Sequence, residues 1–184
     1  MPMPYAVMLR FFLACCLLAG GSSLPAGAAV EAAGLHNIPL WQAIRIGNGW
    51  KVVIEVSDPD CPYSRRMVRY WDLRRDVTRY VFLIALKNHP EAEVKARYIL
   101  SAADRATAYR QVYTGQLDFE EQLLERRYDD HGLFEKHRAV AAGLGVTGTP
   151  TYFIRGVRVN GARLGEIEQL LGGKKYPFKA GDAE

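Results

Sequence analysis

The residues of this chain that could do chemistry lie in two short motifs. The first is Asp58-Pro59-Asp60-Cys61-Pro62-Tyr63, followed by Ser64 where a second cysteine would complete a Cys-X-X-Cys pair. The second is Gly148-Thr149-Pro150-Thr151, far downstream. A cysteine placed between a buried strand and a helix can act as a nucleophilic thiolate, but no second sulfur is placed here to complete an internal dithiol.

Cys61 is expected at the N-terminus of a helix. Pro62 suits the first helical turn, where its missing N–H group costs nothing. The unpaired N–H groups and the positive end of the helix dipole at that position favour a thiolate. Arg65 and Arg66, one turn further on, could add to this effect if they face the sulfur, and the Ser64 hydroxyl could donate a hydrogen bond to the thiolate.

Two further residues have roles that the sequence alone leaves open. Glu55 lies in the strand that leads to Cys61, on the same side as Val53. A carboxyl half-buried near the thiol could take up and release protons for it, whereas the alternative is a glutamate that faces solvent at a strand edge. Thr149–Pro150 is a candidate cis peptide because cis bonds are essentially confined to proline, although most X–Pro bonds are trans.

The first 28 residues have the pattern of a cleaved export signal. Arg10 precedes a short apolar run, and small residues follow at the expected cleavage site. The apolar run is too short to span a membrane. A lipoprotein signal ending at Cys15 and a retained N-terminal anchor are the alternatives. We therefore expect a signal peptide over 1-28, a lead-in segment over 29-49, one folded domain over 50-175 and a C-terminal tail over 176-184.

The composition limits the classes of function that this chain can have. Cleavage would leave about 155 residues, enough for one substantial core. It would remove Cys15 and Cys16, so that Cys61 could not form an internal disulfide. The net charge of +4 falls to +3 with the loss of Arg10, which does not argue for nucleic-acid binding. The four histidines lack metal-ligand spacing with Cys61, so we expect no metal site and no cofactor.

The hydrophobic pattern predicts alternating strands and helices. Leu40, Ala43 and Ile44 fall at helical spacing, before a break at Gly47-Asn48-Gly49. We expect a strand over 51–56, a helix from Pro62 and a second strand over 80–86. Mostly helical structure should follow from 91 to about 126, with a restart at Asp104, and then a helix over 134–144 capped by Gly145. A hairpin over 151–154 and 157–159, a turn at Asn160-Gly161 and a helix over 164–171 should complete the fold. This order predicts an α/β sandwich with a helical insertion.

Both motifs, with Ile44-Arg45-Ile46-Gly47-Asn48-Gly49 and Gly145-Val146-Thr147, resemble the thioredoxin-fold catalytic domain of the DsbC/DsbG disulfide isomerases over roughly residues 44 to 172. The resemblance implies a thioredoxin-like α/β fold for the domain at 50-175, with a helical insertion between the active-site βαβ unit and the cis-Pro hairpin. It implies that Cys61 is the nucleophile, that Glu55 is a buried acid and that Pro150 is a cis-proline beside the sulfur. Thr149 and Pro150, with Pro62 and Tyr63, would bind an extended substrate segment.

The chain departs from that family in three ways. Ser64 replaces the resolving cysteine, which excludes net oxidation or reduction by an internal dithiol. Ser101 stands where the family often carries a structural cysteine, and the expected partner of that cysteine is also missing. The segment before the fold is too short for the family's N-terminal dimerisation domain.

Two functions follow from this pattern. The first is a periplasmic monothiol oxidoreductase or isomerase, exported by a cleaved signal, that forms mixed disulfides with cysteine-containing exported proteins through Cys61. An external thiol reductant could then release those adducts. The second is a redox-inactive thioredoxin-fold module that binds or chaperones a partner in envelope or conjugative-apparatus assembly. Neither function involves nucleic acid or a membrane span in the mature chain.

Overall fold

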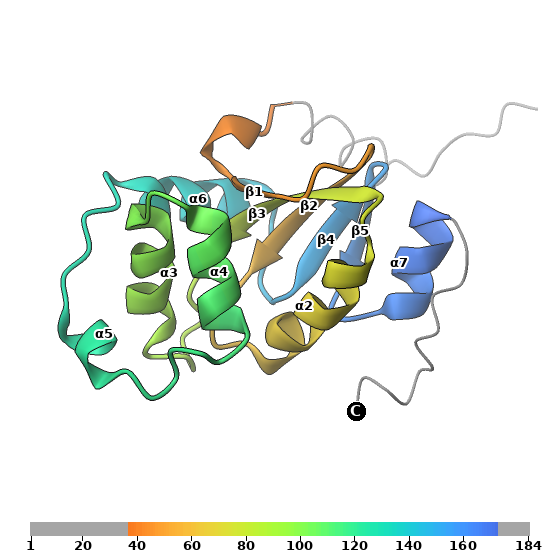
Figure 1. The fold of residues 1–184 in the computed structure, drawn as a ribbon. Coiled ribbons are helices and arrows are strands. Elements are labelled where there is room, and N and C mark those ends of the chain that lie inside the picture. Colours follow the sequence, from red (N-terminus) through yellow and green to blue (C-terminus); the bar gives the residue numbers. More distant parts are fainter. Residues whose placement is uncertain (1–36, 173–184) are drawn as a thin grey trace, which may run out of the picture.

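The computed structural model describes residues 37–172 and contains a five-stranded mixed sheet (Figure 1). The strand order is β1-β3-β2-β4-β5. The strands β2 and β3 are parallel, and the other neighbours are antiparallel. The strand bounds are β1 Ile44–Ile46, β2 Lys51–Ser57, β3 Val77–Leu83, β4 Thr151–Ile154 and β5 Val157–Asn160.

Helices cover both faces of this sheet. The bounds are η1 Leu40–Gln42 (a 3₁₀ helix), α2 Pro62–Leu73, α3 Ala92–Ser101, α4 Arg105–Tyr113, α5 Glu121–Glu125, α6 Leu133–Gly143 and α7 Leu164–Leu171. The helices α2 and α7 pack on one face, where α3 and α4 extend the layer, and α6 and η1 pack on the other. The helices α3 to α6 separate β3 from β4, which confirms the predicted α/β fold with a helical insertion.

Alternation along β2 decides which side chains face which helices. Val53 belongs to the cluster that packs against α2 and α7, whereas Ile54 and Val56 belong to the cluster that packs against α6. On α2, Met67, Val68 and Trp71 form the buried stripe, as the 3.6-residue period requires. Cys61 therefore lies between the end of β2 and the start of α2, and both of these elements pack in the core.

Several predicted elements are confirmed, including β2, α2, α6, the β4–β5 hairpin and α7. The predicted restart at Asp104 is also confirmed, because its side chain caps α4 by accepting a hydrogen bond from the Thr107 N–H group. The predicted turn at Asn160-Gly161 lies at the end of β5, whose last residue is Asn160, and Gly161 has a positive φ of 80°.

One predicted segment has the wrong conformation and another has shifted bounds. The helical spacing over residues 40–44 corresponds to a single 3₁₀ turn followed by β1, which pairs with β3, so the sheet includes part of the predicted lead-in segment. The strand expected at 80–86 exists as β3, but it begins and ends three residues earlier, at Val77 and Leu83. The glycine break between β1 and β2 has a packing reason, because a Cβ at Gly49 would lie 2.0 Å from the Asp76 carbonyl carbon.

The predicted signal peptide, most of the lead-in segment before β1 and the C-terminal tail lie outside the described residues. Within residues 37–172, no helix has the length and apolarity needed to cross a membrane.

Candidate active site

Cys61 lies at the junction between β2 and α2. It is the N-cap of α2, with Pro62 as the first helical residue. Its N–H group donates to the Asp58 carbonyl oxygen at 3.1 Å, which closes a tight turn after β2. The side chain is only 3% exposed. The predicted position at a helix N-terminus is therefore confirmed, but the sulfur is covered.

The second motif contacts the sulfur directly. The Cys61 Sγ–H group donates to the Thr149 carbonyl oxygen at 3.2 Å, a contact between residues 88 positions apart. The Thr149–Pro150 peptide is cis, and Pro150 is buried. The fold thus brings together the two motifs that the sequence marked for thiol chemistry. A donor–acceptor contact of this kind requires the thiol to carry its proton.

The other residues of the first motif have different surroundings. Ser64 is completely buried, and its hydroxyl has no hydrogen-bond partner among residues 37–172. The predicted hydrogen bond from Ser64 to the thiol is thus not made in this structure. Tyr63 is 54% exposed, and the guanidinium of Arg66 lies 5.3 Å from the centre of its ring. Pro62 is also exposed. Pro62 and Tyr63 therefore form an accessible surface beside the covered thiol.

Glu55 is fully buried, so the alternative of a solvent-facing strand edge is wrong. Its Oε2 atom accepts a hydrogen bond from Arg79 Nη1 at 2.7 Å, and the Arg79 side chain is only 5% exposed. The partner of the Glu55 carboxylate is a guanidinium on the neighbouring strand. Any proton transfer between Glu55 and Cys61 would therefore have to occur without a direct contact in this structure.

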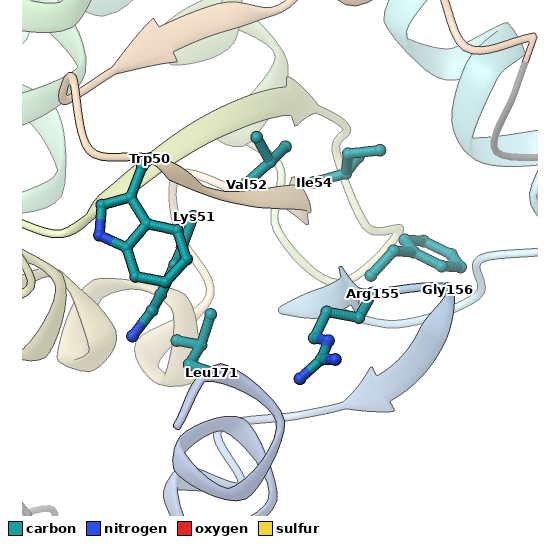
Figure 2. Close-up of a pocket in the computed structure, with 8 residues that line it drawn as sticks. Trp50, Lys51, Val52, Ile54, Arg155, Gly156 and Leu171 are labelled. Carbon is teal, nitrogen blue, oxygen red and sulfur yellow. The ribbon is translucent and has the colours of Figure 1, made fainter. Parts of the chain in front are cut away.

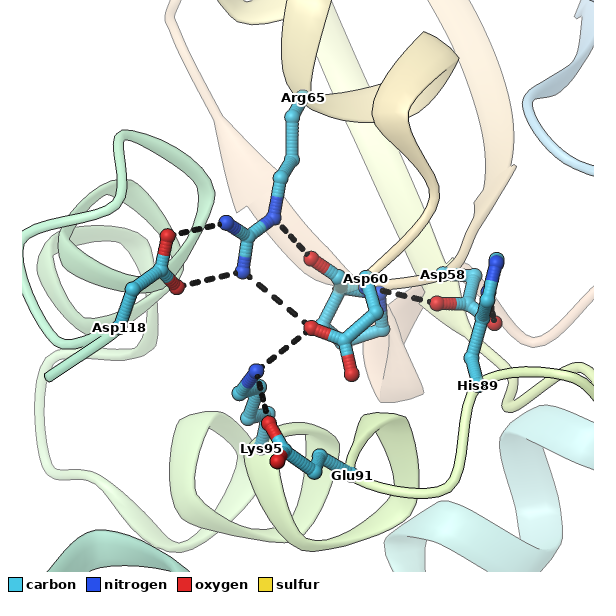
Figure 3. Close-up of polar contacts among 8 residues, drawn as sticks. Asp58, Asp60, Arg65, His89, Glu91, Lys95 and Asp118 are labelled. Carbon is cyan, nitrogen blue, oxygen red and sulfur yellow. Dashed lines mark hydrogen bonds and ion pairs between the residues drawn. The ribbon is translucent and has the colours of Figure 1, made fainter. Parts of the chain in front are cut away.

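Asp58 organises the turn before the thiol, a role that the sequence analysis missed. Its buried carboxylate accepts hydrogen bonds from the N–H groups of Asp60 and Leu86, both at 2.7 Å. The His89 Nδ1 atom lies 3.0 Å from the same carboxylate (Figure 3). An aspartate that bonds the N–H group two residues on is typical of an Asx turn, so the Asp58-Pro59-Asp60 string carried a usable signal.

Arg65 does not face the sulfur. Its Nε atom donates to the Pro59 carbonyl oxygen at 2.5 Å, and Nη1 and Nη2 donate to the two oxygens of Asp118 at 2.6 and 2.8 Å. Asp118 lies in the connection between α4 and α5. The hydrogen bond from Arg65 lowers the pKa of Asp118. The expectation that Arg65 supports the thiolate directly is therefore wrong, because its guanidinium is held by the insertion.

The Asp60 carboxylate, next to Cys61, binds two cations. Lys95 Nζ on α3 lies 2.6 Å from Asp60 Oδ1, and Arg65 Nη2 lies 3.3 Å from the same oxygen (Figure 3). Lys95 also pairs with Glu91 at 2.8 Å. Burial works to lower the pKa of Lys95, but the hydrogen bonds that Lys95 donates to Asp60 and Glu91 outweigh it and raise that pKa. The i,i+4 pair was visible in the sequence, whereas the contact with Asp60 depends on the fold.

A separate groove of about 650 Å³ lies at the other end of β2. Figure 2 shows Trp50 and Arg155 at its border, with Val52, Ile54 and Leu171 along it. These residues flank the start of β2, whereas Cys61 follows the end of that strand, so the groove is not part of the thiol site. No cluster of metal-binding side chains occurs among residues 37–172.

Comparison with known proteins agrees with this geometry. The profile of the thioredoxin-like domain family matches residues 43–171. The chain belongs to this family. A search of curated proteins finds no match for this thioredoxin-like protein. Its structure is similar to that of a disulfide interchange protein from Neisseria gonorrhoeae, with 28% identity and a TM-score of 0.57 over 72% of this chain and 96% of that one.

Two structures of lower sequence identity share the fold. A periplasmic thioredoxin-like protein from Salmonella enterica serovar Typhimurium is 20% identical, with a TM-score of 0.51 over 77% of this chain and 94% of that one. The thiol-disulfide exchange protein alpha-DsbA2 from Wolbachia pipientis is 15% identical, with a TM-score of 0.63 over 82% of this chain and all of that one. The thioredoxin-like fold therefore occurs here with one cysteine in the described residues, Cys61.

Proposed function

We propose that this thioredoxin-like protein is a periplasmic thiol-disulfide exchange protein that forms mixed disulfides with exported proteins through Cys61 alone. The observation that carries the proposal is the contact of Cys61 Sγ, at the N-terminus of α2, with the Thr149 carbonyl oxygen next to the cis bond. A substrate segment could approach over Pro62 and Tyr63, which are exposed beside the thiol.

The proposed reaction conserves electrons overall. The Cys61 thiolate attacks one sulfur of a substrate disulfide, which forms a Cys61–substrate disulfide and releases the other substrate sulfur as a thiolate. A substrate thiolate then attacks the substrate sulfur of that adduct, which forms a new substrate disulfide and restores the Cys61 thiolate. This is an isomerisation. If an external thiol instead attacks the substrate sulfur of the adduct, it releases Cys61 and forms a disulfide with the substrate. A second equivalent of the external thiol then attacks that disulfide, which frees the reduced substrate and leaves the two external thiols joined as a disulfide.

The comparisons support the class of reaction and the compartment. The neighbours described as a disulfide interchange protein and a thiol-disulfide exchange protein share the fold, and another neighbour is described as periplasmic. The expected export signal favours the same compartment. The closer likeness to the DsbC/DsbG isomerases, and the roles of Glu55 and Ser64, remain part of the proposal.

The decisive experiment is acid-trapping of the protein in its own cell envelope, followed by non-reducing gel electrophoresis. We expect reducible adducts that disappear in Cys61→Ala, because no other described residue carries a thiol. Mass spectrometry of the adducts would identify the substrates. Adducts that persist in Cys61→Ala would contradict the proposal.

Ser64→Cys provides a matched gain-of-function variant. The buried position one helical turn from Cys61 would then hold a second thiol, able to attack the adduct and release the substrate by an intramolecular reaction. We expect fewer trapped adducts in Ser64→Cys and an oxidisable pair in the purified protein. Adduct levels equal to wild type, with no intramolecular disulfide after oxidation, would show that Ser64 is not placed as the resolving residue.

The burial of Cys61 favours one alternative, a redox-inactive binding or chaperone module that uses the same surface. Cys61 is 3% exposed and its thiol donates to a carbonyl oxygen, an arrangement that suits an inert thiol. Alkylation of the folded protein separates the two functions. Fast reaction with iodoacetamide near neutral pH supports exchange chemistry, whereas a thiol that reacts only in denaturant, together with an absence of trapped adducts, supports the binding module.

A further inference from the structure

Two carboxylates precede the reactive thiol, and each could oppose thiolate formation. Asp58 and Asp60 lie three residues and one residue before Cys61. A negative charge near a thiol disfavours the thiolate by Coulomb repulsion. Asp58 is satisfied by two backbone N–H groups and His89. The charge of Asp60 is instead balanced by two cations from helices, Lys95 and Arg65.

The cation with the shorter contact comes from the helical insertion. Lys95 on α3 reaches Asp60 Oδ1 at 2.6 Å, with a lysine side chain that is only 8% exposed. A short contact between partly buried groups is screened by water less than a surface pair. The interaction joins residues 35 positions apart, so it also ties the turn before Cys61 to α3.

Arg65 makes a second connection between the same turn and the insertion. Its guanidinium contacts the Pro59 carbonyl oxygen, the Asp60 carboxylate and both oxygens of Asp118 (Figure 3). The two parallel contacts with Asp118 fix the plane of the guanidinium. Two elements of the insertion, α3 and the α4–α5 connection, thereby hold the residues that lead to the thiol.

We propose that Lys95, supported by Arg65, is a positioning residue of the thiol site. Lys95 neutralises the charge of Asp60 and fixes the turn that carries Cys61. The helical insertion thereby sets the fraction of Cys61 that is present as thiolate. The inference rests on the proposed function, in which Cys61 reacts as a thiolate. It assigns the insertion a role in reactivity in addition to its role in the core.

A double-mutant cycle tests this coupling. The rate of Cys61 alkylation by iodoacetamide is measured against pH in wild type, Asp60→Asn, Lys95→Met and the double variant, and the midpoint of each curve is the pH at which half of Cys61 is thiolate. For a slowly reacting thiol, thiolate absorbance near 240 nm provides the same titration. We expect Lys95→Met to raise the midpoint by roughly one pH unit, about a tenfold loss of thiolate below it. Asp60→Asn should lower the midpoint, and the double variant should return close to wild type.

The other titratable groups of this neighbourhood are the same in all four proteins. His89 pairs with Asp58, Glu91 remains on α3, Asp118 remains with Arg65, and Tyr113 is buried with a raised pKa. The buried Glu55 also remains with Arg79. Their contributions are therefore common to all four proteins, and the differences among the four midpoints report the charges of Asp60 and Lys95.

Arg97→Met is the matched control. Arg97 lies on the same helix and pairs with Glu93, Asp130 and Glu135, none of which adjoins Cys61. We expect its midpoint to equal that of wild type. Urea unfolding reports whether each variant folds, and Asp60→Asn, which keeps the shape of the side chain, gives the sign of the effect even if Lys95→Met is unstable.

The inference is overturned if Asp60→Asn raises the midpoint or leaves it unchanged, or if the double variant keeps the raised midpoint of Lys95→Met. Because the readout uses a small alkylating reagent, it does not depend on protein substrates. Coupling without trapped adducts would contradict the proposed function alone. Adducts without coupling would contradict this inference alone.

Discussion

The hydrogen bonds of His137 determine the charge of its ring. The Leu83 N–H group donates to Nδ1 at 2.9 Å, so Nδ1 must carry a lone pair. Nε2 lies 2.9 Å from the Gln42 carbonyl oxygen, which can only accept, so Nε2 must carry the proton. His137 is completely buried on α6 and thus joins β3 and the residue at the end of η1 as a neutral imidazole.

Acid should therefore destabilise the fold through His137. Burial lowers the pKa of His137 from 6.5 to about 4. Because the unfolded chain binds this proton more readily, stability should fall as the pH drops from about 6.5 to about 4, by up to about 3 kcal/mol from this group. Urea unfolding at several pH values in this window measures the slope, and His137→Gln should flatten it. An unchanged slope in the variant would show that His137 does not titrate as inferred.

At the scale of single elements, the β4–β5 hairpin has an unusual turn. Ile154 pairs with Val157, so Arg155 and Gly156 form a two-residue loop. Both have positive φ, at 53° and 82°. Such a loop matches the twist of the strands but favours asparagine followed by glycine, because other side chains clash with the backbone in the left-handed region.

Replacing Arg155 should therefore stabilise the hairpin. We expect Arg155→Asn to raise the free energy of unfolding by up to about 1 kcal/mol, because asparagine tolerates the left-handed conformation better. The midpoint of urea unfolding measures the gain. The matched opposite change is Gly156→Ala, which places a Cβ at a φ of 82° and should destabilise the protein. Loss of stability in Arg155→Asn would instead mean that the Arg155 side chain, which lines the groove, stabilises the protein by more than the left-handed conformation costs.

The elements with strong local patterns could be predicted from the sequence. The Val- and Ile-rich β2 and the Pro62 start of α2 are decided by residues close in the chain. The three-residue β1 is too short to show a period, and its strand conformation depends on pairing with β3. The contact of Cys61 with Thr149 followed from the resemblance. The links of Asp60 to Lys95 and of Arg65 to Asp118 could not be predicted, because they depend on where the insertion packs.

At the scale of the whole molecule, a buried ion pair joins two parts of the core. The Glu55–Arg79 pair lies on the sheet face covered by α2 and α4. The guanidinium of Arg79 lies 5.4 Å from the centre of the Trp71 ring and 5.5 Å from that of Tyr109. These two rings belong to different hydrophobic clusters, so the charged pair stands where the clusters meet.

Breaking this pair on one side should be costly. Glu55→Gln leaves the Arg79 charge buried without its counter-charge, and we expect a loss of about 3 kcal/mol or more in the free energy of unfolding. Glu55→Gln/Arg79→Met removes both charges and should recover much of that loss. Urea unfolding of wild type, Glu55→Gln, Arg79→Met and the double variant measures the cycle. If Glu55→Gln were as stable as wild type but shifted the pH profile of Cys61 alkylation, the predicted role of Glu55 as a proton shuttle would be favoured instead.

The lengths of the outer strands have a consequence for self-association. The strands β1 and β5 form the two edges of the sheet, with three and four residues, and β1 carries the exposed Arg45. Short, charged edges are poor templates for the addition of further strands. A protein that exchanges disulfides with exported chains, as we propose, meets extended segments that could add to a free sheet edge. Its short edge strands would restrict strand addition to the loop beside Cys61, so that the protein would not become a template for aggregation of its own substrates.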